Sequence, residues 1–290
     1  MQGSPSSERA RAALAVAAGA AIIGLAPIAV RVSDVGPMAT AFWRFAFALP
    51  LLVLLVAVAR PRLTLNAPVR APLAAAGVCF GLDLTLWHAA LTHTTVLNAT
   101  LLSNMTPIFA VAGGFLFLRE RITRAFAIGA AIAGIGAVLL TASRAQGGEG
   151  AWFGDALGVA SAVWYAAYLV ILRQVRDGAD VRMAMLVTTA VSLVVASAAA
   201  ALFGEDWTPH SATGWLVLMG LGLVHVGGQG LIAYGVARLN IALSTVLLWV
   251  QPVAAAGLSW AIFGEALGPL ALVGAALVLG GIYVVQRGRA

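Results

Sequence analysis

Four ionisable residues stand inside stretches of the sequence that are otherwise almost wholly apolar: Arg44, Asp83, His88 and His225. A charged side chain at the centre of a bilayer costs about 2.5 to 3.5 kcal/mol on insertion scales, so each is expected to have a partner or a pathway to serve. At a helical rise of ~1.5 Å per residue, Arg44 and Asp83 lie at similar depths in neighbouring apolar stretches. They are interpreted as an ion pair, or else Arg44 meets a substrate carboxylate, or Asp83 takes up and releases a proton.

The histidines do not have the spacing of a metal site. His88 and His93 are five residues apart, whereas paired ligands on a helical face are four apart. His88 and His225 are therefore either buried structural residues or part of a cavity lining or proton relay. No metal and no cofactor is expected. An intramembrane enzyme based on Asp83 and His88 would need a nucleophile or metal beside them, and the sequence offers none, so we expect no enzymatic activity.

The composition predicts a membrane protein. The 290 residues are 61% hydrophobic and only 10% charged, whereas soluble domains carry roughly 25% charge. The basic residues are all arginine and gather at the ends of apolar runs, which indicates membrane topology rather than a nucleic-acid-binding surface. The single Cys79 lies in an apolar run and excludes a disulfide framework.

Ten apolar runs have the length of membrane-spanning helices. The predicted spans are 12–31, 38–59, 72–92, 95–118, 123–142, 152–172, 182–203, 213–236, 242–263 and 267–286. The first run follows Arg9 and Arg11 like a signal peptide, but it is long enough to span and has no convincing cleavage site.

An internal duplication organises the chain. The stretch from Asn98 to Glu120 matches a second one from Leu243 to Glu265 at an offset of about 145 residues, which places Pro107 on Pro252. The match continues into the next run. We therefore predict a cytoplasmic tail over 1–11, a first repeat over 12–142, a connecting loop over 143–151, a second repeat over 152–286 and a cytoplasmic tail over 287–290.

Arginine distribution predicts that the second repeat is inverted. The loops assigned to the cytoplasm carry most of the arginines, at positions 9, 11, 60, 62, 70, 119, 121, 124, 173, 176, 182, 238, 287 and 289. The positive-inside rule then places both termini in the cytoplasm. The duplicated turn reads LRERITR in the first copy and FGEALGP in the second, as expected for equivalent loops on opposite sides of a membrane. Inverted repeats are typical of transporters whose substrate site lies between the two halves.

Polar residues precede the proline in each copy. The first copy carries Asn98, Thr100, Ser103 and Asn104 before Pro107, and the second carries Ser244, Thr245, Trp249 and Gln251 before Pro252. A proline frees a backbone carbonyl and permits a bend, and these side chains either satisfy the freed group or offer polar groups to a zwitterionic ligand.

Aromatic residues supply further candidates for a cavity wall. Trp164, Tyr165 and Tyr168 lie together in the span 152–172, and either pack against neighbouring helices or face aromatic ligands. Trp87 and Gln229 are weaker candidates for the same wall. The small residues around Gly129 and Gly274 and the terminal Glu120 and Glu265 are assigned to structure, the former to close helix packing.

These features resemble the EamA-type transporters of the drug/metabolite transporter superfamily over essentially the whole chain. The residues that carry the resemblance are Trp43-Arg44-Phe45, the stretch from Asn98 to Glu120 with Pro107, and its copy with Pro252 and Glu265. Within the superfamily, the sequence is similar to bacterial YddG-type exporters of aromatic and other neutral amino acids. The second half departs from the pattern, because Val187-Thr188-Thr189 stands where the Trp-Arg-Phe motif would recur.

The resemblance implies an all-α integral membrane protein of ten transmembrane helices in two inverted five-helix repeats. It implies export of amino acids across the bacterial inner membrane by alternating access, without ATP, through a cavity between the repeats. The expected partners are a small-molecule substrate and the lipid bilayer, with no nucleic acid, in a monomer or homodimer. The alternative is an exporter of another small metabolite or drug.

Overall fold

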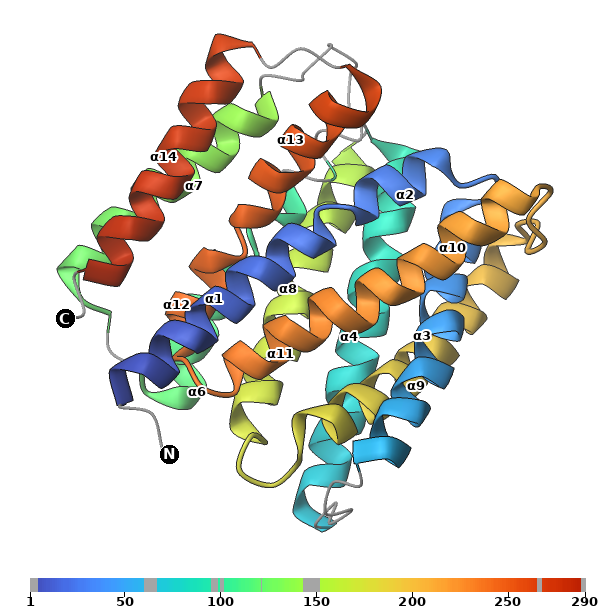
Figure 1. Ribbon diagram of the computed structural model, residues 1–290, viewed down its shortest axis with the longest axis horizontal. Helices are drawn as coiled ribbons and strands as arrows, with labels where there is room; N and C mark the ends of the chain where they lie inside the picture. The colour runs from blue at the N-terminus through green and yellow to red at the C-terminus, as the bar shows by residue number, and fades with distance from the viewer. Residues whose placement is uncertain are drawn as a thin grey trace.

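The computed structural model describes residues 5–59, 67–94, 99, 102–120, 122–142, 152–264 and 268–287. Within these ranges every regular element is a helix and no strand occurs (Figure 1). Asn98 and Glu265, both named by the sequence analysis, lie outside the described residues.

The helices follow the predicted apolar runs, but α1 begins at Pro5, inside the predicted tail, and α4 begins at Ala67, five residues before the predicted span. They are α1 (Pro5–Ile23), α2 (Ala26–Val32), α3 (Pro37–Ala59), α4 (Ala67–His93), α6 (Thr106–Leu118), α7 (Arg124–Ala142), α8 (Trp152–Gln174), α9 (Val181–Phe203), α10 (Ala212–Val224), the π-helical turn η1 (His225–Gln229), α11 (Gly230–Val236), α12 (Ile241–Leu247), α13 (Val250–Phe263) and α14 (Pro269–Arg287). Seven continuous helical segments in the described part are long and apolar enough to cross a membrane. Three shorter apolar helices, Thr106–Leu118, Arg124–Leu139 and Pro269–Val285, lie within further predicted spans. The prediction of an all-α membrane protein is confirmed.

The helix before each duplicated proline is interrupted. The chain turns at Asn104 and Met105 ahead of Pro107, and again at Leu248 and Trp249 ahead of Pro252. At these turns the amides bond to the third preceding carbonyl, as in Ile108 to Met105 (2.9 Å). Because Pro107 has no N–H to donate to the Ser103 carbonyl, the Thr106 hydroxyl donates to it instead, at 2.8 Å.

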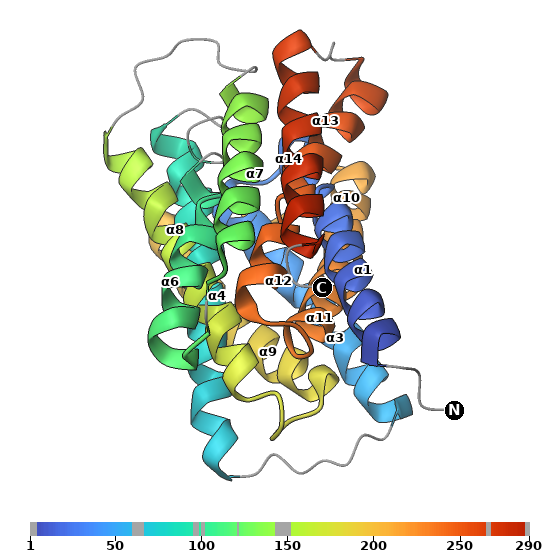
Figure 2. The same cartoon turned by 90° about the vertical axis from the view of Figure 1, so that its left-hand side faces the viewer.

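The α7–α14 pair shows how the two copies are related, and it forms one edge of the molecule (Figures 1 and 2). A Cβ added at Gly129 would lie 2.7 Å from the Gly281 carbonyl oxygen, and one at Gly136 would lie 2.6 Å from the Gly274 carbonyl oxygen. The order of these contacts shows that the helices run antiparallel. Since the duplication equates Gly129 with Gly274 and Gly136 with Gly281, the two contacts are copies of each other. The assignment of the small residues to packing is confirmed.

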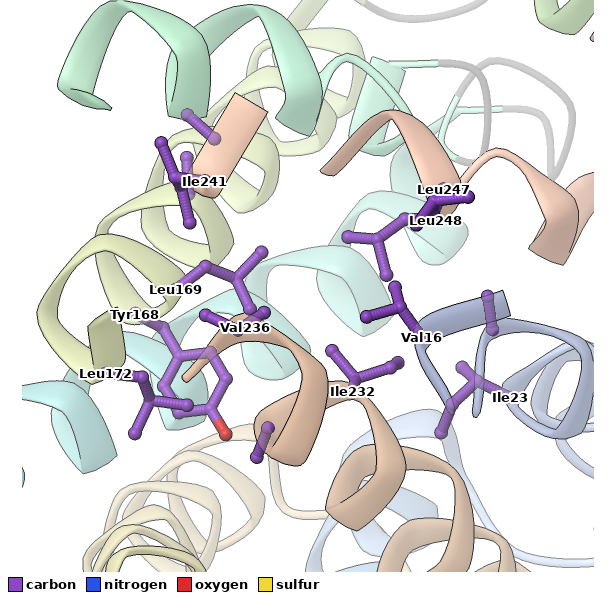
Figure 3. Packing of buried hydrophobic residues seen from close by; sticks show 14 of the residues in the cluster. Val16, Ile23, Tyr168, Leu169, Leu172, Ile232, Val236, Ile241, Leu247 and Leu248 are labelled. Atoms are coloured by element: carbon purple, nitrogen blue, oxygen red, sulfur yellow. The ribbon is translucent and has the colours of Figure 1, made fainter. Parts of the chain in front are cut away.

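Buried side chains from both repeats form the interior. Figure 3 shows Val16 and Ile23 of α1 close to Ile232 of α11, with Leu169 of α8 and Leu247 of α12 in the same cluster. Around this cluster, α4 packs along α8 and α9, α3 along α9 and α10, and α6 along α8 and α12. The interrupted helices α1–α2 and α12–α13 and the start of α6 thereby converge on the same region as the middles of α3, α4 and α8.

Candidate functional site

A small cavity of about 90 Å³, lined in part by polar and charged side chains, lies where these elements converge, and we call it the polar cavity. Both repeats contribute to it. Its lining is Ile23, Ala26, Pro27, Arg44, Phe80, Asp83, Leu84, Trp87, Ser103, Asn104, Thr106, Pro107, Ser161, Tyr165, Gln229, Leu248, Trp249 and Gln251.

Arg44 brings a buried cation to the cavity from the middle of α3, where its side chain is 4% exposed. Its Nε atom is buried without a hydrogen-bond partner. Among the described residues no carboxylate lies within 4.0 Å of the guanidinium. The Arg44–Asp83 salt bridge allowed by the sequence is therefore not formed.

Asp83 lies on α4 with a different partner. Its Oδ1 atom accepts a hydrogen bond of 2.6 Å from the Ser161 hydroxyl of α8, and the residue is 8% exposed. A hydrogen bond to a carboxylate is short and strong, and it fixes the orientation of the group. The cavity thus presents one guanidinium and one carboxylate that do not neutralise each other by direct contact.

The three side chains of the Trp-Arg-Phe motif have different roles. Trp43 donates to the Trp207 carbonyl at 2.6 Å and anchors α3 to the segment before α10. Arg44 lines the cavity, and Phe45 is fully buried against the ring of His225 at 5.3 Å between ring centroids. The motif therefore anchors α3 on both sides of the cation.

A tyrosine and glutamine network forms a further part of the wall. Tyr165 lines the cavity and its hydroxyl lies 3.4 Å from the Gln229 side chain, which also donates to the Tyr168 hydroxyl at 3.3 Å. Tyr168 is fully buried behind this wall and stacks on Phe80 with ring centroids 4.7 Å apart. Gln229 ends the π-helical turn η1, an irregularity frequently found at functional sites.

The two interrupted helices meet at equivalent positions. Trp249 donates from its indole nitrogen to the Asn104 carbonyl at 2.9 Å, and the duplication places Asn104 on Trp249. The amide of Ile108, which would reach that carbonyl in a regular helix, bonds to Met105 instead. A side chain from the interrupted helix of the second repeat thus donates to the carbonyl group left free in the interrupted helix of the first.

Both candidate histidines are buried outside the cavity lining. The Nδ1 atom of His88 lies 2.7 Å from the Leu84 carbonyl, and the Nε2 atom of His225 lies 3.0 Å from the Thr189 hydroxyl. Within the described residues no group of three or more histidine, cysteine or acidic side chains could hold a metal ion.

The predicted candidates fall into three groups. Those in the cavity lining are Arg44, Asp83, Trp87, Ser103, Asn104, Tyr165, Gln229 and Trp249, together with Pro107. Those outside the lining are His88, Trp164, Tyr168, His225, Ser244 and Pro252. Trp164 is 37% exposed, and the buried Ser244 donates to the Asn240 carbonyl at 2.9 Å. Asn98 lies outside the described residues.

Sequence reasoning missed Ser161, Phe80 and the contribution of α1–α2. Ser161, Tyr165 and Tyr168 are spaced by four and three residues, which places them on one helical face. That spacing could have indicated Ser161. The residues Ile23, Ala26 and Pro27 carry no polar signal and reach the cavity because the helix is interrupted between Ile23 and Ala26.

The cavity has the chemistry to bind a small zwitterion. Arg44 has donor geometry suited to a carboxylate, and Asp83 suits an ammonium group. Indole, phenol, amide and hydroxyl groups complete the lining.

Comparison with known proteins gives consistent matches. The sequence pattern of the EamA-like transporter family matches residues 10–142 and 152–287. The chain is 32% identical to a "probable terminal-alkyne amino-acid exporter" of Streptantibioticus cattleyicolor, over 67% of this chain and 65% of that protein, slightly less than two thirds of the relative's length. It is 24% identical to a pseudopaline exporter of Pseudomonas aeruginosa, over 73% of each chain. A protein of known crystal structure has the same fold, with a TM-score of 0.82 and 21% identity over 96% of this chain and 98% of the other.

Proposed function

The chain belongs to the EamA-like transporter family, and from this premise we propose that it exports amino acids, aromatic and other neutral ones. The observation that carries the proposal is the guanidinium of Arg44, which has no carboxylate within 4.0 Å among the described residues and whose Nε atom has no hydrogen-bond partner, in the same small cavity as the Ser161-bound carboxylate of Asp83. A buried cation without a protein partner is costly in a membrane, and a bound substrate carboxylate would offset that cost.

The relatives support the export of small molecules with such groups. One is named as an amino-acid exporter and another as a pseudopaline exporter. Aromatic side chains in the cavity, namely Phe80, Trp87, Tyr165 and Trp249, favour apolar and aromatic side chains of the substrate.

We further propose the topology and mechanism. The chain would cross the bacterial inner membrane ten times, in two inverted repeats with both termini in the cytoplasm, as a monomer or homodimer. The antiparallel α7–α14 pair supports the inversion, because equivalent helices of the two repeats run in opposite directions. Alternating access would follow from rocking of the repeats about the cavity, with the interrupted helices as the bending points.

The test is counterflow of labelled phenylalanine and alanine in proteoliposomes. Arg44→Gln should lower transport at least tenfold, because the substrate carboxylate loses a charged donor worth about 1.5 to 3 kcal/mol. The thermal stability of the variant should be unchanged or higher, because an uncompensated buried charge is removed.

Arg238→Gln serves as the control, since Arg238 lies outside the cavity and contacts Glu8 at 3.6 Å. Transport of both amino acids by Arg44→Gln at the wild-type rate would refute the assigned role of Arg44. Transport of no amino acid by the wild type would favour export of another metabolite or drug.

A further inference from the structure

A second, apolar cavity of about 660 Å³ lies between α6 and α7, and we call it the lateral groove. Its lining includes Ile108 of α6, Ala131 and Ile135 of α7, Val246 of α12, and Trp249. It exists because α7 packs along α14 rather than along α6. Ile108 and Ile135 are both more than half exposed, so the groove is open toward the lipid-facing side of these helices.

The lateral groove adjoins the polar cavity directly. Asn104, Pro107 and Trp249 line both spaces. The indole nitrogen of Trp249 is bonded to the Asn104 carbonyl, while the far edge of its ring faces Gly134 of α7, where an added Cβ would lie 3.3 Å from Cη2. Trp249, Asn104 and Pro107 therefore form the wall that the two spaces share.

The sizes and linings of the two spaces are complementary. Ligand pockets usually measure about 300 to 1,000 Å³. The polar cavity, at about 90 Å³, is far below that range, whereas the lateral groove, at about 660 Å³, lies within it. The polar cavity has room for the charged groups of an amino acid and the apolar groups nearest to them, but not for an extended side chain.

We propose that the lateral groove binds the hydrocarbon side chain of a transported amphipathic amino acid whose ammonium and carboxylate groups lie in the polar cavity. This inference rests on the proposed function, because it places the zwitterionic end at Arg44 and Asp83. The side chain passes Trp249 to reach the groove. The substrate class is then 2-amino acids with extended apolar side chains.

The test is competition against labelled alanine bound to the purified protein in phosphatidylethanolamine and phosphatidylglycerol nanodiscs. The competitors are 2-aminobutanoate, 2-aminohexanoate and 2-aminooctanoate. Each added methylene should tighten binding roughly fourfold, the equivalent of about 0.8 kcal/mol.

Ala131→Phe places a bulky ring in the lateral groove. This variant should lose the increase in affinity with side-chain length. Ala276→Phe is the matched control, since the duplication equates Ala276 with Ala131, and Ala276 is exposed on α14 outside the groove. This control should keep the wild-type dependence on chain length. Thermal unfolding of both variants shows whether the substitutions disturb the fold.

Equal affinities of the three competitors for the wild type would overturn the inference and would indicate that lipid chains fill the groove. The inference would also be overturned if Ala131→Phe kept the wild-type increase in affinity with chain length. These outcomes leave the binding of alanine itself intact. If the wild type binds neither alanine nor phenylalanine, the proposed function fails, and the inference fails with it.

Discussion

Arg44 and Asp83 are held in the same cavity by different parts of the protein. Packing of Trp43 and Phe45 fixes the position of Arg44 on α3, and Ser161 fixes Asp83 from α8. In a direct ion pair the two groups would neutralise each other, and neither charge would be available to a ligand. Their separation keeps a donor and an acceptor available to the two ends of a zwitterion.

Ser161→Ala tests the role of the hydrogen bond to Asp83. Without the hydroxyl the carboxylate loses a partner worth about 1.5 to 3 kcal/mol and its fixed orientation, so the KM for alanine counterflow should rise roughly tenfold or more. Ser197→Ala is the control, because the Ser197 hydroxyl donates to the Leu193 carbonyl of its own helix, away from the cavity. Equal KM values for the two variants would contradict the assigned role of Ser161.

For single residues, the sequence predicts how deep a side chain lies in a membrane span better than it predicts whether the side chain faces the cavity. Arg44 and Asp83 could be identified because ionisable residues are conspicuous in apolar runs. Trp164 and Tyr165 have the same depth and type, yet only Tyr165 lines the cavity. A helix that is apolar on every side has no amphipathic period from which to choose between them.

Among the elements, α12 depends on a residue from the opposite repeat. The Glu120 carboxylate accepts hydrogen bonds from the backbone amides of Ile241 at 2.9 Å and Ala242 at 3.4 Å. It therefore supplements the N-cap residue Asn240, whose side chain accepts from the Leu243 amide, at the N-terminus of α12, where unpaired amides and the helix dipole favour an anion. The expected structural role of Glu120 is confirmed, with its partner in the other copy rather than in its own turn.

Glu120→Ala should destabilise the protein by about 1 kcal/mol, as loss of a helix cap does. Glu120→Gln should lose less stability than Glu120→Ala, because the glutamine side chain keeps an acceptor oxygen. Thermal unfolding in detergent measures both changes. Glu8→Ala provides the comparison, because its 3.6 Å contact with Arg238 is largely exposed and should contribute little. If the alanine variants at positions 120 and 8 lose the same stability, the cap does not act as described.

The helix boundaries were largely predictable, and the irregularities inside the helices were only partly so. Prolines 107 and 252 indicated the interruptions before α6 and α13. The interruption between α1 and α2 and the π turn of η1 were not predicted, since neither changes the apolar character of the run. The π turn nevertheless carries Gln229 into the cavity.

For the molecule as a whole, the duplication is the most informative feature of the sequence. The matched pattern over 10–142 and 152–287 and the exchanged glycine contacts of α7 and α14 agree with two copies facing each other. Contacts between equivalent positions, such as Trp249 with Asn104, then lie where the two copies meet.

Inversion predicts that the turn before α7 and the turn before α14 face opposite sides of the membrane. In a Cys79→Ala background, Thr123→Cys and Gly268→Cys place one thiol at each of these exposed positions. A membrane-impermeant maleimide applied to intact cells should label position 268 and should reach position 123 only after permeabilisation. Labelling of both positions from the same side would contradict the inverted arrangement.

The most direct test of the zwitterion site is competition for labelled alanine binding by analogues that lack one charge. Alaninamide has no carboxylate for Arg44, and propionate has no ammonium for Asp83. The account predicts that unlabelled alanine competes, whereas each analogue competes at least tenfold less well, since each leaves one buried charge without an opposite charge on the ligand. Competition by either analogue at the strength of alanine would show that the cavity does not recognise both charges.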